Sequence, residues 1–296
     1  MLEKIKDRLP GGKFYKAFIT SLHHLISGKY NFADKEILVA YFLGRNFFSK
    51  HYYSKYYHYL EKEYSAGDYF NFKGIKIPKL SDSYEKDVFM QEFLDILLPL
   101  LNFYGRHLGE GPYLYHQAQI QKGDIVIDAG ANIGMFSALA SHLGGIVYAF
   151  EPVKEIREKY LEKTAQLNPN INIVPLALSN NNSETLIKGG IGDSSIIFER
   201  QKDDTFSEIV KTITLDDWVK QNNIPKVDFI KADIEGAERL MLEGAQWVLK
   251  TYAPKLAICT YHLPDDKEVL TNLILQANPN YKIEYAWKKL YAWVEK

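Results

Sequence analysis

The chain has 296 residues, 46% of them hydrophobic, and its 36 basic and 37 acidic residues leave a formal net charge of −1. This length suggests one large domain or two smaller ones, with enough residues for a sizeable core, and the balanced charge argues against a dedicated binder of nucleic acid or anionic membrane. The single cysteine, Cys259, excludes a disulfide framework or a cysteine metal site within one chain.

Residues 1–115 form the first predicted region, which is mainly helical by its hydrophobic periodicity. Residues 68–78 interrupt the helical pattern and predict a β-hairpin that turns at Lys73-Gly74. The N-terminus has no apolar run fit for a signal peptide, and the longest apolar stretch, residues 93–105, is too short and proline-broken to span a bilayer. A cytoplasmic protein without membrane insertion is therefore predicted.

An aromatic-rich run at residues 51–60 lies within this first region. It favours a helix face that is buried against the second region or a dimer partner, and the alternative is an aromatic wall for a substrate. The run is compatible with a homodimer. This first region is expected to shape the substrate pocket, the oligomer contacts, or both.

Residues 116–296 form the second region, in which apolar β-branched runs alternate with helical patterns. This alternation predicts an α/β fold with a doubly wound parallel sheet. Residues 281–296 predict a terminal antiparallel hairpin around a two-lysine break. The alternation lapses at residues 180–215, which we interpret as short β segments of an insertion or flap. The expected strands are residues 124–129, 146–152, 171–178, 226–234 and 254–262, and the expected helices are residues 132–143, 153–168 and 236–249.

The stretch GDIVIDAGANIGMFSALA, which begins at Gly123, marks the predicted ligand site. In open α/β sheets, ligands bind beyond the carboxyl ends of the strands. Asp128, Gly130 and Gly134 lie where the first strand of this region ends and its helix begins. Gly130 is expected to take a positive φ in the tight turn, and Gly134 to let the helix approach a ligand or the sheet. A nucleotide-like ligand is therefore expected here.

The nature of that ligand follows from charge and spacing. The turn lacks the middle glycine of G-x-G-x-x-G, and the carboxylate of Asp128 would repel a pyrophosphate. S-adenosylmethionine has no phosphate and carries an ammonium and a sulfonium, so an acid suits it. Glu151 ends the next strand, where an acidic side chain can accept both ribose hydroxyls. The plainer alternatives are a helix N-cap for Asp128 and a solvated strand-end charge for Glu151.

Several segments in chain order resemble the successive blocks of FkbM-family methyltransferases. The resemblance implies a class I S-adenosylmethionine-dependent methyltransferase (Rossmann-like) fold with its terminal antiparallel hairpin. It also implies methylation of oxygen on sugars or polyketide-type acceptors. The segments are residues 110–124, 124–137, 147–155, 214–218, 227–245 and 258–266.

The predicted catalytic residues are Asp233, Glu235 and His262. Asp233 is expected beside the methionine end of the cofactor and Glu235 at the lip of the following turn, where a carboxylate can orient or deprotonate an acceptor hydroxyl. His262 is the leading candidate for a general base, and the alternative is a histidine that caps the helix after it. Both carboxylates can also be structural strand-end or N-cap charges. Lys231 is interpreted as a member of a structural ion pair.

Three further residues are candidate cofactor contacts. Backbone groups at Leu178 and Ser179 are expected to bracket the adenine edge. Asn132 either stays a local hydrogen-bonding residue or reaches the methionine carboxylate, and Tyr113 either covers the cofactor or packs in the core. No H-x-x-x-H spacing or carboxylate cluster in the sequence predicts a bound metal, and the alternative is an acid pair at strand ends that holds Mg²⁺.

The sequence therefore predicts an S-adenosylmethionine-dependent methyltransferase. O-methylation of a sugar, a polysaccharide precursor or another small hydroxyl or amine acceptor is favoured, with no nucleic-acid partner. The alternatives are a nucleotide-dependent oxidoreductase and a non-catalytic S-adenosylmethionine-binding module.

Overall fold

The computed structural model describes residues 57, 60–80, 86, 89–90, 92–97, 100, 110–188 and 207–295. The chain divides into two compact units, residues 1–72 with 79–111 and residues 73–78 with 112–296. The predicted helices of residues 1–56 and most of the aromatic run at residues 51–60 lie outside the described residues. Within the described part of the chain, no helix is both long and apolar enough to cross a bilayer.

The described core of the first unit is aromatic. The ring of Tyr57 packs edge-on against Phe70 and Phe89 at centroid distances of 5.3 and 5.4 Å. Its hydroxyl donates a hydrogen bond to the carbonyl of Leu80 over 2.9 Å. Tyr57, which belongs to the aromatic run, is therefore a core residue of its own unit. The elements here are β1 (Ser65–Ala66), β2 (Tyr69–Phe72) and the π-helix η1 (Phe93–Leu97).

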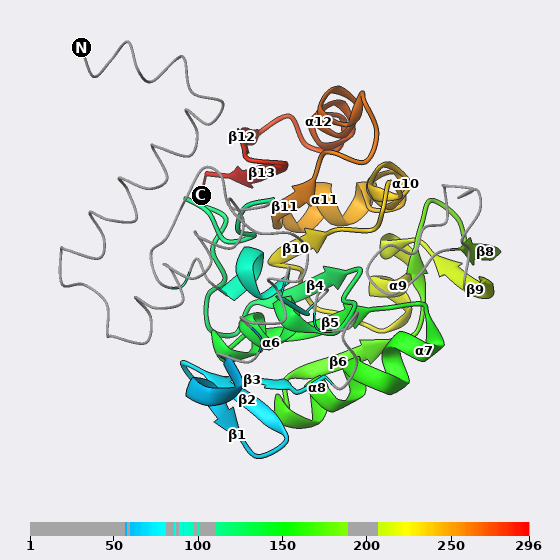
Figure 1. Cartoon of the computed structure of the whole chain (residues 1–296). Helices are drawn as coiled ribbons and strands as arrows, with labels where there is room; N and C mark the ends of the chain where they lie inside the picture. The colour runs from blue at the N-terminus through cyan, green and yellow to red at the C-terminus, as the bar shows by residue number, and fades with distance from the viewer. Residues whose placement is uncertain are drawn as a thin grey trace, which may run out of the picture. The chain divides into compact units, whose positions relative to one another are not determined.

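The second unit contains a seven-stranded sheet in the order β12-β13-β11-β10-β4-β5-β6 (Figure 1). β13 runs antiparallel to both of its neighbours, and the remaining neighbours pair in parallel. The predicted doubly wound sheet with a terminal antiparallel hairpin is confirmed. The strands are β4 (Ile125–Ala129), β5 (Ile146–Phe150), β6 (Ile171–Val174), β10 (Phe229–Ala232), β11 (Lys255–Cys259), β12 (Tyr281–Ala286) and β13 (Lys289–Val294).

The two faces of this sheet are covered differently. Because side chains alternate along a strand, Ile127 and Ile230 face a buried apolar cluster that includes residues of α9 to α12. Phe136 of α6 packs near Phe229 at a centroid distance of 6.0 Å on the opposite face. The helices are α6 (Met135–His142), α7 (Lys154–Ile156), the π-helix η3 (Arg157–Leu161), α8 (Glu162–Leu167), α9 (Leu215–Gln221), α10 (Glu238–Glu243), α11 (Gln246–Tyr252) and α12 (Asp266–Ala277).

The turn at Lys73-Gly74 follows β2 and precedes β3 (Ile75–Pro78). Both turn residues have positive φ values, 53° and 93°, as a two-residue hairpin turn of type I′ requires. The expected turn is therefore present. β3 is held within the second unit by Asn168, whose side-chain amide donates to the carbonyl of Lys76 over 2.8 Å.

The predicted third strand, residues 171–178, is divided in two. β6 ends at Val174, and Pro175 cannot donate to a strand ladder. The chain then forms β7 (Ala177–Leu178), which belongs to a separate three-stranded sheet in the order β7-β9-β8. The short β segments predicted for the insertion are confirmed as β8 (Glu184–Lys188) and β9 (Ser207–Ile213), and residues 189–206 lie outside the described part.

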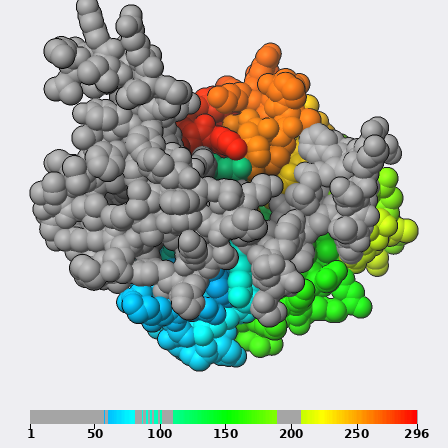
Figure 2. All heavy atoms as spheres, viewed as in Figure 1, coloured from blue at the N-terminus to red at the C-terminus, as the bar shows by residue number. Residues whose placement is uncertain are grey.

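The helix predicted at residues 236–249 is also divided, between α10 and α11 at Gly244. A Cβ atom at Gly244 would lie 2.1 Å from the carbonyl oxygen of Ser179, so the close contact between these segments requires glycine. The terminal hairpin was expected to turn at Lys288-Lys289, but its turn residues are Trp287 and Lys288. Lys289 is buried and is already the first residue of β13, where it pairs with Cys259. Figure 2 shows orange atoms of α12 and red atoms of the chain's end on one face of the molecule.

Candidate active site

The glycine turn after β4 is fixed by backbone contacts on two sides. Gly130 has a φ of 74°, as predicted, and the N–H groups of Gly130 and Ala131 donate to the carbonyl of Phe150 over 3.1 and 3.0 Å. A Cβ at Gly130 would lie 2.0 Å from the carbonyl oxygen of Asp233. Glycine is therefore needed here both for the turn and for the close approach of the chain after β10.

Gly134 has a different neighbour from the one expected. Its φ is 87°, and a Cβ there would lie 2.8 Å from side-chain carbons of both Leu161 and Thr164. Thr164 also donates its hydroxyl to the carbonyl of Ile133 over 2.7 Å. Gly134 thus lets the start of α6 approach the helix of residues 154–167, which corrects the prediction of an approach to a ligand or to the sheet.

Asp128 is fully buried and forms an ion pair with Lys231 at 3.0 Å. The other carboxylate oxygen accepts the hydroxyl of Ser137 over 2.6 Å. The ammonium of Lys231 also donates to the carbonyl of Gly130 over 2.6 Å, so one side chain binds both the carboxylate and the turn. Lys231 is therefore the structural ion-pair member that the sequence predicted.

This burial corrects the role predicted for Asp128. Its negative charge is compensated by Lys231 on the neighbouring strand, so its carboxylate does not present an open charge to a ligand. The partly exposed carboxylates at this edge belong to Asp233 and Glu235, whose side chains are 24% and 22% exposed. These two described carboxylates are placed to attract a cationic ligand.

Glu151 lies at the carboxyl end of β5 and ties the glycine turn to it. Its two carboxylate oxygens accept the backbone N–H groups of Asn132 and Val153, each over 3.0 Å. Burial raises the pKa of Glu151 to about 7, although these two N–H groups act to lower it. Asn132 has a φ of 49° and takes part through its backbone, in keeping with the local role considered for it.

Ser179 is buried and its backbone groups are occupied. Its N–H donates to the carbonyl of Ile213 over 3.0 Å, and its carbonyl faces Gly244 at close range. This N–H belongs to the pairing beside β7 and β9, so it does not bracket an adenine, and for the other backbone groups of Leu178 and Ser179 that role stays a prediction.

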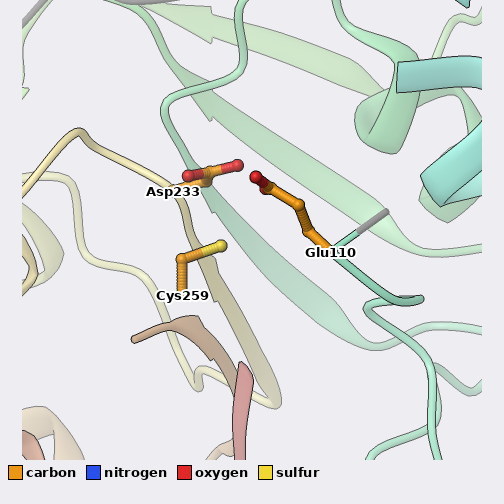
Figure 3. Close-up of side chains that lie close together, drawn as sticks. All are labelled: Glu110, Asp233 and Cys259. Carbon is orange, nitrogen blue, oxygen red and sulfur yellow. The ribbon is translucent and has the colours of Figure 1, made fainter. Parts of the chain in front are cut away.

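Tyr113 is buried and donates its hydroxyl to Asp233 over 2.6 Å. The ammonium groups of Lys231 and Lys289 lie 5.3 and 4.3 Å from the centre of its ring. Burial, followed by the charge of Asp233, raises the pKa of Tyr113 well above its usual value, so the phenol keeps its proton. Figure 3 shows Asp233 next to Cys259, at the ends of neighbouring strands β10 and β11. Of the two roles considered for Tyr113, the structure supports packing.

His262 lies among three carboxylates. Its Nδ1 atom is 3.1 Å from Oε1 of Glu238, and its Nε2 atom is 3.6 Å from Oδ1 of Asp233 and 3.7 Å from Oε2 of Glu235. Burial lowers the pKa of His262, but the hydrogen bond and charge of Glu238 and the charges of the other two raise it to about 9.

A histidine with this pKa carries its proton at neutral pH, which does not favour His262 as the general base, and its catalytic role stays a prediction. Asp233 is the charged carboxylate that faces this imidazolium. Burial raises its pKa, but Lys231, Lys289 and His262 together lower it below its usual value, and the carboxylate stays charged. At this edge of the sheet, Asp233 is thus a partly exposed, charged group able to accept a hydrogen bond or a proton.

Glu238 and Arg239 are site residues that the sequence did not reveal. Glu238 is fully buried, and its carboxylate accepts the N–H groups of Ile234 and Gly236 over 2.8 and 2.9 Å. Arg239 donates to Asp266 over 2.8 Å. The recognisable signal was an acid in the first turn of a predicted helix.

The start of α12 shows no capping contact from His262. Its N-cap residue is Asp265, which makes no side-chain cap hydrogen bond, and Asp266 accepts the N–H of Leu263 over 2.8 Å.

The same cluster has the composition of a metal site. Asp233, Glu238 and His262 each place one potential ligand atom within 4.8 Å of the others. The three residues are separated in the chain, so sequence spacing could not reveal their convergence. The imidazolium already supplies a positive charge among these carboxylates, and we assign no metal to them.

The comparisons with known proteins agree with this architecture. The methyltransferase FkbM domain family matches residues 128–283. The hexuronic acid methyltransferase AglP of Haloferax volcanii is 24% identical over an alignment that covers 56% of this chain and 67% of that protein. The 31-O-demethyl-FK506 methyltransferase FkbM of Streptomyces tacrolimicus is 26% identical, with 45% and 64% covered.

A solved structure is similar in outline. The crystal structure of the methyltransferase FkbM from Methylobacillus flagellatus KT aligns with a TM-score of 0.47 and 23% identity, over 72% of this chain and 56% of that one. The chain thus spans about two thirds of the length of the curated relatives that it matches and little more than half of this crystallised one.

The Asp128–Lys231 pair generates a stability prediction. Asp128→Asn or Lys231→Met leaves a buried charge without its counter-ion, and each is expected to lower the free energy of unfolding by about 3–5 kcal/mol. The double variant is expected to lose less than the sum of the two, because it leaves neither charge unpaired. Urea unfolding of all four proteins measures this coupling.

The control is the exposed Lys154–Glu158 pair, whose side chains are 65% and 57% exposed. Glu158→Gln is expected to change stability by under about 1 kcal/mol. Additive losses at Asp128 and Lys231 would contradict the structural role assigned to the pair.

The carboxylates around His262 generate a pH prediction. Folding raises its pKa from 6.5 to about 9, so the associated stabilisation is complete below pH 6.5 and is lost as the pH rises through 9. It corresponds to about 3 kcal/mol. We expect the free energy of unfolding to fall between pH 7 and pH 9.5, and this slope to be much smaller in His262→Gln. Equal slopes would show that His262 does not carry the charge.

Proposed function

The chain belongs to the FkbM methyltransferase family, and we propose that it transfers a methyl group from S-adenosylmethionine to an oxygen atom of a sugar-like acceptor. The observation that carries this proposal is the edge of the sheet where the glycine turn, Glu151 and a charged Asp233 meet. A class I methyltransferase fold binds its ligand at this edge, beyond the carboxyl ends of the strands.

The residues present fit S-adenosylmethionine. Glu151 would accept the ribose hydroxyls, because it ends the strand beside the glycine turn and its buried carboxylate gains by accepting further hydrogen bonds. Asp233 and Glu235 would face the cationic methionine end. When bound, the cofactor supplies a methyl carbon that its sulfonium has already activated. Lys231 keeps the turn in shape through the carbonyl of Gly130.

Asp233 would handle the acceptor's proton. Asp233 would accept the proton that the acceptor oxygen loses when it takes up the methyl group that the cofactor would supply. Tyr113 donates to one carboxylate oxygen, and the His262 imidazolium faces the other. Both are positioning residues for Asp233, and holding the reacting atoms in line supplies much of the rate.

The sugar-like acceptor is supported by one relative, whose name states that it methylates hexuronic acid. The name of the other relative states a demethylated FK506 as its substrate and mentions no sugar. We therefore propose mainly that the methyl acceptor is an oxygen atom, and in second place that this oxygen belongs to a sugar. The homodimer, the cytoplasmic location and the absence of a nucleic-acid partner stay predictions.

Cofactor binding tests the proposal directly. The purified chain is expected to bind S-adenosylmethionine and S-adenosylhomocysteine in calorimetry, with no binding of NADH. In a screen of sugar, sugar phosphate and amine acceptors, S-adenosylhomocysteine should be released with at least one hydroxyl compound. Binding of NADH alone would refute the proposal in favour of an oxidoreductase.

The matched variants in this assay are Asp233→Asn and Asn172→Ala. Asp233→Asn is expected to lower kcat by about 100-fold or more, because the amide cannot take the proton, and to leave a measurable affinity for S-adenosylhomocysteine. Asn172, on β6, is exposed and donates to the carbonyl of Val147, so its loss controls for the effect of a sheet substitution.

Glu151 makes cofactor affinity depend on pH. Ribose hydroxyls would donate to the charged carboxylate, so the cofactor binds best when Glu151, with a pKa of about 7, has lost its proton. We expect Kd for S-adenosylhomocysteine to rise by about tenfold from pH 8 to pH 6. Glu151→Gln should bind weakly at both values. If Kd for S-adenosylhomocysteine depended on pH equally in Glu151→Gln and in the natural chain, Glu151 would not be the group that binds the ribose hydroxyls.

A further inference from the structure

The hairpin of β8 and β9 carries an exposed apolar pair that lies outside the candidate active site. Leu186 and Ile209 are opposite each other on the two strands, and their side chains are 46% and 69% exposed. Because side chains alternate along a strand, Glu184 and Lys188 lie on the same face of β8 as Leu186. Adjacent apolar side chains that are exposed and rimmed by charges indicate a contact surface.

β8 is the outer strand of its small sheet, at the right-hand margin of Figure 1. Among the described residues, it pairs with β9 on one side and with no strand on the other. Thr212 donates its N–H to the carbonyl of Ser183 over 2.8 Å, so Ser183 directs this group toward β9. Because this direction alternates along an antiparallel ladder, the backbone groups of Glu184, Leu186 and Lys188 are directed outward. An edge strand offers such groups to another strand.

The opposite face of the hairpin is packed and tied to the second unit. Ile187 and Val210 are buried on this face. The carboxylate of Glu208 accepts the backbone N–H of Lys154, at the start of α7, over 3.0 Å. The outer edge of β8 is therefore formed in advance, and little conformational freedom is lost when another strand pairs with it.

The sequence of β8, ETLIK, is complementary to itself in an antiparallel pairing. A twofold axis through Leu186 brings this residue opposite Leu186 of a second copy, and brings Glu184 opposite Lys188 of that copy. The symmetry makes the charge contact twice, and it joins the two Leu186–Ile209 pairs on one face of the combined sheet. Charged side chains on an edge strand normally prevent pairing with another chain. Here the opposite charges at the two ends of β8 favour it, because oppositely charged cross-strand pairs are stabilising.

We propose that β8 pairs antiparallel with β8 of a second copy of this chain and joins the two β7-β9-β8 sheets into one continuous sheet. This inference does not depend on the proposed function, and the contact surface lies outside the aromatic run at residues 51–60. Each copy contributes a strand of five residues. The contact is therefore small beside the roughly 1,600 Å² of a standard stable interface, and we expect a weak dimer with a micromolar Kd.

Sedimentation velocity of the full chain tests the contact, over concentrations from about 1 µM to about 500 µM, the range suited to a small interface. The natural chain is expected to dimerise within this range. Glu184→Lys and Lys188→Glu each place like charges at both symmetric contacts, and each should raise the dimer Kd by about tenfold or more. An equimolar mixture of these two variants restores opposite charges at both contacts, as does the double variant. Both should recover the natural Kd.

Lys211→Glu is the matched control. Lys211 is exposed on β9 opposite Glu184, so this change also places like charges side by side in the hairpin, but one strand away from the proposed contact. It should leave the dimer Kd unchanged. The proposal is refuted by a natural chain that stays monomeric over the whole range, by single variants that dimerise as the natural chain does, or by a mixture that does not recover. An equal loss in Lys211→Glu would also refute it, because damage to the hairpin would then explain the effect.

Discussion

The buried ion pair between Asp128 and Lys231 is the interaction on which the edge of the sheet depends. It joins β4 to β10 at adjacent register positions, and the same ammonium also holds the carbonyl of Gly130. A buried pair of this kind contributes little net stability when complete, but losing one member leaves a costly unpaired charge. The glycine turn and the chain after β10 are thus fixed together, which is why Gly130 can lie against the Asp233 backbone.

The second constraint is charge balance. Asp233, Glu235 and Glu238 converge on His262, and three carboxylates in a partly buried site would raise one another's pKa values without a nearby cation. The imidazolium resolves this conflict, and it thereby keeps Asp233 charged where an acceptor hydroxyl would need it. The histidine acts on the site as a counter-ion, which is a more economical account of its position than proton exchange with the acceptor.

The sequence predicted whatever depends on local pattern. Alternating apolar runs predicted the sheet and its terminal hairpin, and glycine spacing predicted the positive φ of Gly130. It failed where the outcome depends on residues brought together by folding. The partner of Asp128 lies on β10, the contact of Ser179 with Gly244 divides a helix, and the raised pKa of His262 depends on Glu238 in α10. None of these contacts produces a hydrophobic periodicity or a motif spacing that can be recognised in the sequence.

The same pair explains how three separate segments of the chain form one edge. The glycine turn follows β4, Glu151 follows β5 and Asp233 follows β10, and all of them lie within residues 128–283, which match the FkbM domain family. Parallel pairing brings the ends of these strands together, and Lys231 of β10 holds the carbonyl of Gly130. Glu151 joins the third segment, because its carboxylate accepts the N–H of Asn132 in the glycine turn. The edge is therefore held by contacts that need no ligand.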